Sequence, residues 1–251
     1  MRVVSAGLAL GGVELLIDRR AFQRGGPFDF RVYEALRGRP ARRMAAASTV
    51  SAVAMVQIVA SLVVVAMGPL SVVGRWVLLV ALGASLVVRQ RRVVGGDGAE
   101  QLSEIVLLSA CLALLPYPGE ARVQLAVLFI AAQLALSYVA AGIFKLISPV
   151  WRSGEALPGI LNTYGHGVAW ASYAVGRWRW IGFAAGWFVM LFEVIFPVVF
   201  VGPPWLVAVL LATGFAFHLG CAVLMGLNSF VWAFPATYAC VLATRALLGV
   251  G

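Results

Sequence analysis

The chain has 251 residues, of which 62% are hydrophobic and 12% are charged, and its formal net charge is +9. A soluble domain has roughly 25% charged residues, so this composition excludes a soluble fold. The mean hydropathy of +0.96 also excludes a disordered chain. We therefore predict an all-α, polytopic membrane protein whose residues 1–251 form a single transmembrane domain.

Eight apolar segments follow one another along the chain, separated by short or polar stretches. A membrane span needs roughly 20 apolar residues, and the first and fourth segments are shorter than that, so we expect a bundle of six to eight transmembrane helices. The predicted segments are residues 3–17, 45–67, 72–88, 102–115, 123–147, 180–201, 205–225 and 230–248.

Three long polar loops separate these segments. If all eight segments cross the membrane, loops 18–44, 89–101 and 148–179 lie on the same side. Most of the 19 basic residues belong to these loops or flank them, and the positive-inside rule therefore predicts that this side faces the cytoplasm. Anionic lipid head groups account for basic loops beside apolar spans, so we expect the lipid bilayer, and no nucleic acid, as the partner of these arginines.

Lys145 is the only lysine among the 19 basic residues, and it lies near the end of the fifth apolar segment. Tyr138 precedes it by seven residues, so the amine and the phenol share one helical face. A lysine at the end of a span often snorkels to the membrane surface, which is one interpretation. The other is a proton-transfer role, because a desolvated lysine can lose its proton and an arginine cannot.

Glu193 lies within the sixth segment, four residues before Pro197. A proline has no N–H to donate to the carbonyl four residues earlier, so we expect a distortion of the helix and a free acceptor at Glu193. A charged group inside a span is costly, which makes Glu193 a candidate site residue. The alternative is a structural ion pair with an arginine or lysine elsewhere in the bundle.

His218 and Asp97 are the other candidates. His218 lies within the seventh segment, where a catalytic role and a simple interhelical hydrogen bond are about equally supported. No second histidine stands at metal-ligand spacing, so we expect no metal. Asp97 follows two glycines before the fourth segment, where it either caps the helix or turns toward the site.

Two blocks of the sequence carry a resemblance to a known family. Residues 138–157 contain an aromatic residue, a turn of small residues and glycine, Lys-Leu, and then Trp-x-x-Gly; residues 217–230 contain His-Leu followed by Gly, Asn and an aromatic residue. Both blocks resemble the membrane domain shared by vitamin K-dependent gamma-carboxylases and their bacterial relatives, the horizontally transferred transmembrane (HTTM) family. The Gly-Gly-Asp before the fourth segment and the Glu of the sixth are similar features.

The resemblance implies a carboxylase-like membrane enzyme, a lyase or monooxygenase, in a bacterial cytoplasmic membrane. Its cofactor would be a reduced quinone of the vitamin K or menaquinol type, with O2 and CO2 as co-reactants, and its substrate a peptide or a small lipophilic molecule. Lys145 would be the base, with Asp97 and His218 as supporting catalytic groups. The substrate-binding residues would be Tyr138, Trp151, Arg152, Glu193 and Asn228.

Two other classes of function stay open on the residues alone. One is a non-catalytic membrane partner in the maturation of, or immunity to, a peptide toxin, which would bind a peptide through Arg37, Arg39, Arg42 and Arg43. The other is a quinone- or lipid-binding protein without chemistry of its own. Replacing Lys145 would abolish activity in the enzyme and would be silent in the partner protein.

Overall fold

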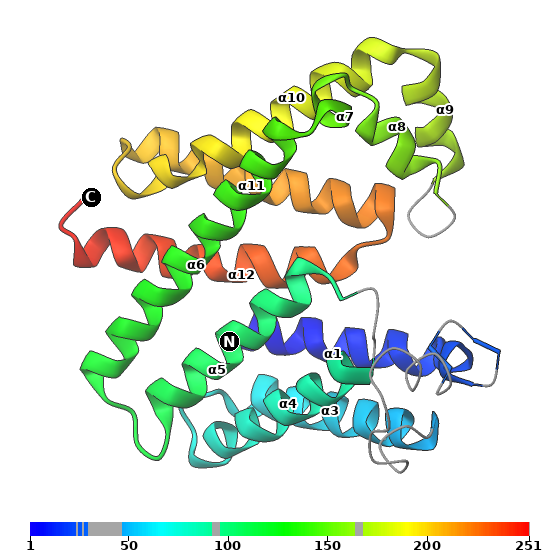
Figure 1. Cartoon of the computed structure of the whole chain (residues 1–251). Helices are drawn as coiled ribbons and strands as arrows, with labels where there is room; N and C mark the ends of the chain where they lie inside the picture. Colours follow the sequence, from blue (N-terminus) through cyan, green and yellow to red (C-terminus); the bar gives the residue numbers. More distant parts are fainter. Residues whose placement is uncertain (24, 27, 30–46, 92–95, 164–167, 251) are drawn as a thin grey trace. The chain divides into compact units, whose positions relative to one another are not determined.

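The computed structural model describes residues 1–23, 25–26, 28–29, 47–91, 96–163 and 168–250. Within these ranges the regular structure is entirely helical (Figure 1). The predicted all-α fold is therefore confirmed. Alanine, leucine and valine dominate the long helices, in which every backbone hydrogen bond is made within the segment, as the hydrocarbon core of a bilayer requires.

Six helices of the described chain are long and apolar enough to cross a membrane, so the chain is an integral membrane protein. This number lies at the lower end of the predicted six to eight. The shorter helices α1 (Arg2–Ile17) and α5 (Gly98–Leu114), which have 16 and 17 residues, correspond to the two short apolar segments. The six candidate spans are Ser48–Met67, Val72–Gln90, Glu120–Ile147, Arg179–Phe200, Pro204–Met225 and Asn228–Leu247.

The chain divides into two compact units, Met1–Ala126 and Val127–Gly251. The first unit contains α1, the 3-10 turn η1 (Arg19–Phe22), α3 (Ala47–Met67), α4 (Val72–Arg91), α5 and the start of α6 (Glu120–Ile147). Helix α3 packs between α1 and α4 (Figure 1). The single-domain organisation stays a prediction.

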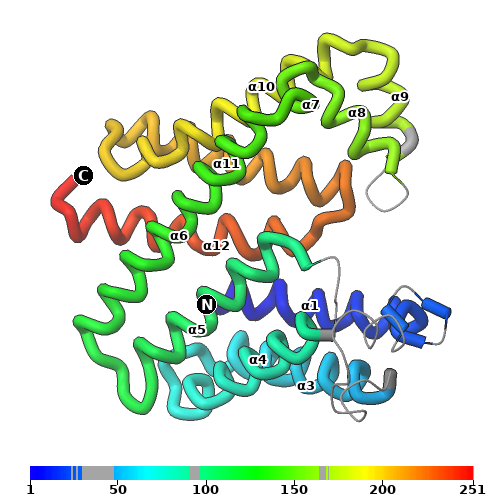
Figure 2. Tube along the Cα trace, viewed as in Figure 1, coloured from blue at the N-terminus to red at the C-terminus, as the bar shows by residue number. Residues whose placement is uncertain are grey.

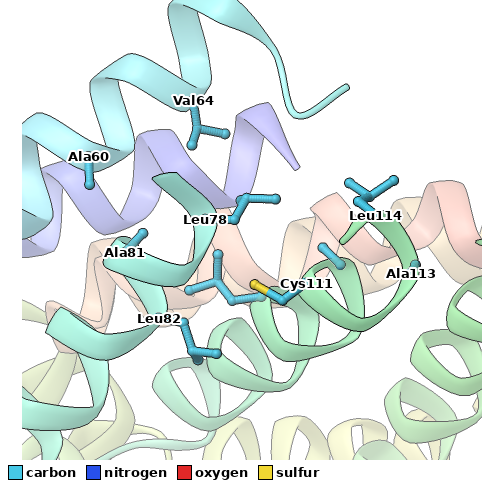
Figure 3. Packing of buried hydrophobic residues seen from close by; sticks show 10 residues of the cluster. Ala60, Val64, Leu78, Ala81, Leu82, Cys111, Ala113 and Leu114 are labelled. Atoms are coloured by element: carbon cyan, nitrogen blue, oxygen red, sulfur yellow. The ribbon is translucent and has the colours of Figure 1, made fainter. Parts of the chain in front are cut away.

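The core of the first unit is aliphatic. Side chains from α3, α4 and α5 interlock there (Figure 3). Val64, Leu78 and Leu107 are completely buried. Small residues such as Ala81 and Cys111 fill the spaces between them. Burying a leucine or valine side chain contributes about 1.5–3 kcal/mol in water, whereas packing between helices in lipid depends mainly on this close fit.

The second unit contains the rest of α6, three short helices, and then α10 (Arg179–Ile195), the 3-10 segment η2 (Phe196–Phe200), α11 (Pro204–Met225) and α12 (Asn228–Leu247), whose order along the chain is traced in Figure 2. Helices α11 and α12 pack against each other. They are joined at Gly226, whose φ of +69° is a left-handed conformation that suits glycine at the end of a helix.

The predicted polar loop 148–179 is mostly helical. It folds into α7 (Pro149–Arg152), α8 (Ala156–Leu161) and α9 (Ala169–Arg177), and all three contact α10. Pro149 opens α7, where the N–H that proline lacks would have no partner in any case. Gly154 follows α7 with a φ of +80°, and a Cβ there would lie 2.7 Å from the backbone of Phe183. The glycine thus lets the short helices pack closely on α10.

Candidate functional site

The centre of the candidate site is an ion pair between Lys145 on α6 and Glu193 on α10. Lys145 Nζ donates to both carboxylate oxygens of Glu193, each at 2.7 Å. The side chain of Glu193 is 3% exposed and that of Lys145 is 20% exposed. The lysine therefore neutralises a buried carboxylate while part of its own side chain stays accessible, and the predicted interhelical pairing of Glu193 is confirmed.

Gly142 allows the two helices to approach at this point. A Cβ at Gly142 would lie 2.7 Å from a methyl group of Val194 and 3.0 Å from Cβ of Glu193. Contacts below 3.0 Å do not occur in real structures, so only glycine fits without a shift of α6 or α10. Because Gly142 lies one helical turn before Lys145, it sets the spacing of the ion pair.

The backbone changes immediately after Glu193. Helix α10 ends at Ile195 and the chain continues as the 3-10 segment η2, which contains Pro197. The sequence predicts a distortion at this proline, and the structure has a change of helix type there. Glu193 thus lies in the last turn of α10.

A second polar group of the same unit joins α6, α11 and α12. Tyr138 Oη lies 2.6 Å from His218 Nε2 and 3.0 Å from Tyr238 Oη, so the two phenols and the imidazole form one hydrogen-bonded chain. His218 is 1% exposed, and its Nδ1 atom has no hydrogen-bond partner in the described protein. The interhelical hydrogen bond predicted for His218 is therefore present, and one ring nitrogen remains available.

Aromatic rings hold this chain in place. Tyr138 stacks on Phe196 at 4.0 Å between ring centres, and His218 stacks on Phe234 at 4.2 Å. Gly214, one turn before His218, leaves the space that the hydroxyl groups fill, because a Cβ there would lie 2.3 Å from Tyr238 Oη. The phenol–imidazole chain thus requires glycine at position 214 of α11.

Trp151 lies beside the ion pair. Its ring centre is 5.3 Å from Lys145 Nζ, which is within the range of a cation–π contact. Its backbone carbonyl oxygen would be 3.6 Å from a Cβ at Gly186, so α7 packs on α10 through this residue. Of the predicted substrate-binding residues, the structure therefore gathers Trp151 and Glu193 around Lys145.

The remaining predicted site residues lie elsewhere or have other contacts. Asp97 accepts a hydrogen bond of 2.7 Å from the backbone N–H of Glu100 and caps α5 in the first unit, which is the alternative that the sequence offered. Arg152 is exposed at the end of α7, and Asn228 is exposed at the start of α12. Their catalytic and substrate-binding roles stay predictions.

The arginines assigned to peptide binding, which are Arg37, Arg39, Arg42 and Arg43, lie outside the described residues.

The sequence interpretation missed several buried polar residues. Glu104, inside the fourth apolar segment, accepts a hydrogen bond from Arg89, and the rule that singled out Glu193 would also have found it. Arg245 in α12 is 5% exposed and donates to the carbonyl oxygen of Val199 at 2.8 Å. Tyr238 had no sequence signal that separates it from the tyrosines at the surface.

Comparisons of the chain with protein-family profiles, with curated proteins and with solved structures find no match.

Proposed function

We propose that the second unit is the proton-transfer site of a carboxylase-like membrane enzyme that works with a reduced quinone. The observation that supports this most directly is the pairing of the lone lysine with a buried glutamate. An ion pair in a span that had only to be neutral would be served equally by arginine, the cation this chain uses everywhere else. Lysine differs from arginine in being able to release a proton. A lysine at this position is therefore an advantage over an arginine only in a site that transfers protons.

The residues around Lys145 fit a flat, lipophilic ring that carries hydroxyl groups. Two of the three N–H bonds of the ammonium are directed at Glu193, which leaves one position on Nζ for an oxygen of a bound molecule. Trp151 offers an aromatic surface 5.3 Å from the same nitrogen. The partly exposed side chain of Lys145 gives access from outside the bundle.

When bound, a reduced quinone supplies electrons for the reduction of oxygen and a ring hydroxyl that must lose its proton. Lys145 would first pass one of its protons to an oxygen of Glu193 at 2.7 Å, and the neutral amine would then turn its lone pair toward the ring hydroxyl and take that proton on Nζ. The pair gains one proton in total, Lys145 ends as an ammonium, and the carboxylate becomes a neutral carboxyl group. Glu193 thus stores the proton, and its burial keeps that proton away from bulk water.

Tyr138 and His218 act as positioning residues in this proposal. Tyr138 lies on the same face of α6 as Lys145, and its ring is fixed between Phe196 and the edge of Phe192. The hydrogen bond to His218 ties that face of α6 to α11. The hydrogen bonds therefore fix the rotation of α6 relative to α11 and α12, and the ring contacts with Phe192 and Phe196 fix it relative to α10 and η2.

The test is oxygen consumption by the purified protein in detergent micelles supplied with reduced menaquinone. We expect the wild-type protein to consume oxygen. Lys145→Ala and Lys145→Arg should each reduce the rate at least about 100-fold, since a general base contributes about 10²–10⁴ to a rate. Glu193→Gln should do the same because it removes the proton store. Arg177→Gln, which removes an exposed charge at the end of α9, should leave the rate unchanged.

Lys145→Arg is the decisive variant because it keeps a positive charge beside Glu193 but cannot give up a proton to become a neutral base. Full activity of a folded Lys145→Arg protein would exclude proton transfer by this residue. An inactive wild-type protein with reduced menaquinone would exclude the proposed cofactor class. Unchanged function of Lys145→Ala, together with loss of function on replacing the arginines of loop 18–44, would favour the peptide-binding alternative.

A further inference from the structure

A cavity of about 550 Å³ lies between the turn that joins α7 to α8, the helices α8 and α9, and the start of α10. It is separate from the ion pair of the proposed site, since neither Lys145 nor Glu193 lines it. The elements that line it, which are the turn after α7, α8, α9 and the first two turns of α10, are grouped together in Figure 1. Its size is within the usual range of small-ligand sites, roughly 300–1,000 Å³.

One acidic and one basic side chain form the charged part of this cavity, and Ser153 adds a hydroxyl group. Arg179 and Glu155 both line it, and a guanidinium nitrogen of Arg179 lies 3.6 Å from a carboxylate oxygen of Glu155. Their side chains are 84% and 63% exposed, so water competes with this contact and the pair contributes little by itself. Both groups are therefore free to bind a ligand that carries the opposite charges.

The rest of the lining is mainly apolar. Trp180, Phe183 and Val175 contribute hydrophobic surface, and Pro158 adds to it from α8. Arg179 is the first residue of a candidate membrane span, so the cavity lies at the end of that span. Exposed tryptophans such as Trp180 are typical of the level at which lipid head groups meet water.

We propose that this cavity binds the head group of a zwitterionic phospholipid, a property that goes beyond the proposed enzyme function and does not depend on it. The phosphate would lie against Arg179 and the amine against Glu155. The first carbons of the lipid would follow Trp180 and Phe183 toward the membrane interior. A net-anionic lipid fits less well, since the carboxylate of Glu155 would lie beside its phosphate without a cation to match it.

The experiment is native mass spectrometry of the delipidated full-length protein. It is incubated with equal amounts of phosphatidylethanolamine and phosphatidylglycerol that carry identical acyl chains. We expect at least a threefold preference for phosphatidylethanolamine, with one molecule retained. Glu155→Gln should reverse the preference, because the cavity then carries one positive charge, and Arg179→Gln should lower retention of both lipids. Arg177→Gln, which removes a charge outside the cavity, should leave the preference as it is.

A steric pair of variants tests whether the cavity itself is the site. Gly176 lines the cavity, and a Cβ added there meets no atom within 4 Å, so Gly176→Leu would extend into open space without a clash. Gly159 on α8 has equally free surroundings but does not line the cavity. We expect Gly176→Leu to reduce retention of phosphatidylethanolamine at least threefold, and Gly159→Leu to have no effect.

Three outcomes would overturn the proposal. They are an equal or greater retention of phosphatidylglycerol by the wild-type protein, an unchanged preference in Glu155→Gln, and full retention in Gly176→Leu. Soluble phosphoethanolamine distinguishes a lipid site from a site for the free head group. It should not displace the lipid at equal concentration, and displacement at that concentration would also overturn the assignment to a membrane lipid.

Discussion

The two compact units each bury a glutamate, and they neutralise it with different cations. In the first unit Glu104, 6% exposed, is hydrogen-bonded by Arg89, whose side chain is 47% exposed. In the second unit Glu193 is equally buried, and its partner Lys145 is 20% exposed. An arginine can only balance the charge, whereas a lysine can balance the charge and also exchange a proton.

The side chains buried around the two ion pairs also differ in their chemistry. The main core cluster of the first unit is built from alanine, valine, leucine and one cysteine, and Gln57, Arg75 and several serines are buried elsewhere in the same unit. The second unit buries two tyrosines and a histidine in one hydrogen-bonded chain among phenylalanines. This hydrogen-bonded chain, together with the Lys145–Glu193 pair, is the reason why proton transfer is proposed for the second unit.

The largest expected effect comes from breaking the lysine pair. Lys145→Met leaves the carboxylate of Glu193 buried without a cation, and we expect a loss of about 3 kcal/mol in the free energy of unfolding. The double variant Lys145→Met, Glu193→Leu removes both charges and should recover most of that loss. Equilibrium unfolding in mild detergent measures both. A single variant as stable as the wild-type protein would show that the pair does not stabilise the second unit.

A smaller effect is expected from the phenol–imidazole chain, which has no counterpart in the first unit. Gly214→Ala places a methyl group where the tyrosine hydroxyls lie, so it should break the contact between Tyr138 and Tyr238 and cost about 2 kcal/mol. The near-ultraviolet circular dichroism of the tyrosines should change as well. Gly220→Ala in the same helix meets no atom within 4 Å and is the matched control. Equal behaviour of the two variants would contradict the close packing at Gly214.

The smallest expected effect is in the first unit. Arg89→Lys keeps a positive charge beside Glu104, and the side chain of Arg89 is 47% exposed, so we expect a change of no more than about 0.5 kcal/mol. Oxygen consumption with reduced menaquinone should also be unchanged. For Lys145→Arg, we expect the same two measurements to show that stability is retained and that activity is lost. A strong loss of activity in Arg89→Lys would remove the distinction between the two units.

The helical class and the membrane spans were predictable from the sequence because they follow from composition and segment length. Lys145 and Glu193 could be selected one by one, since a charge in an apolar segment is rare. Their pairing could not be predicted, because the two residues are 48 positions apart and several arginines were equally good partners for the glutamate. Tyr238 joins the site through the packing of α12 on α11, which periodicity does not encode.

The polar stretch 148–179 is a second region whose structure could not be predicted from the sequence. Its composition is that of a loop, and its three short helices are stabilised by contact with α10 rather than by propensity. The cavity near Arg179 exists only once these helices are in place. Sequence patterns therefore located the spans well and gave no indication of the cavity that the short helices form at the start of α10.

In the proposed proton-transfer site, the absence of a side chain at Gly142 would control reactivity as well as folding. A methyl group there would push α6 away from α10 by a few tenths of an ångström, and the 2.7 Å contacts of the ion pair would lengthen. Proton exchange depends steeply on donor–acceptor separation, so turnover would respond to a displacement that the helices could otherwise tolerate. A designer wishing to tune the rate of this protein without touching a reactive group would begin at this glycine.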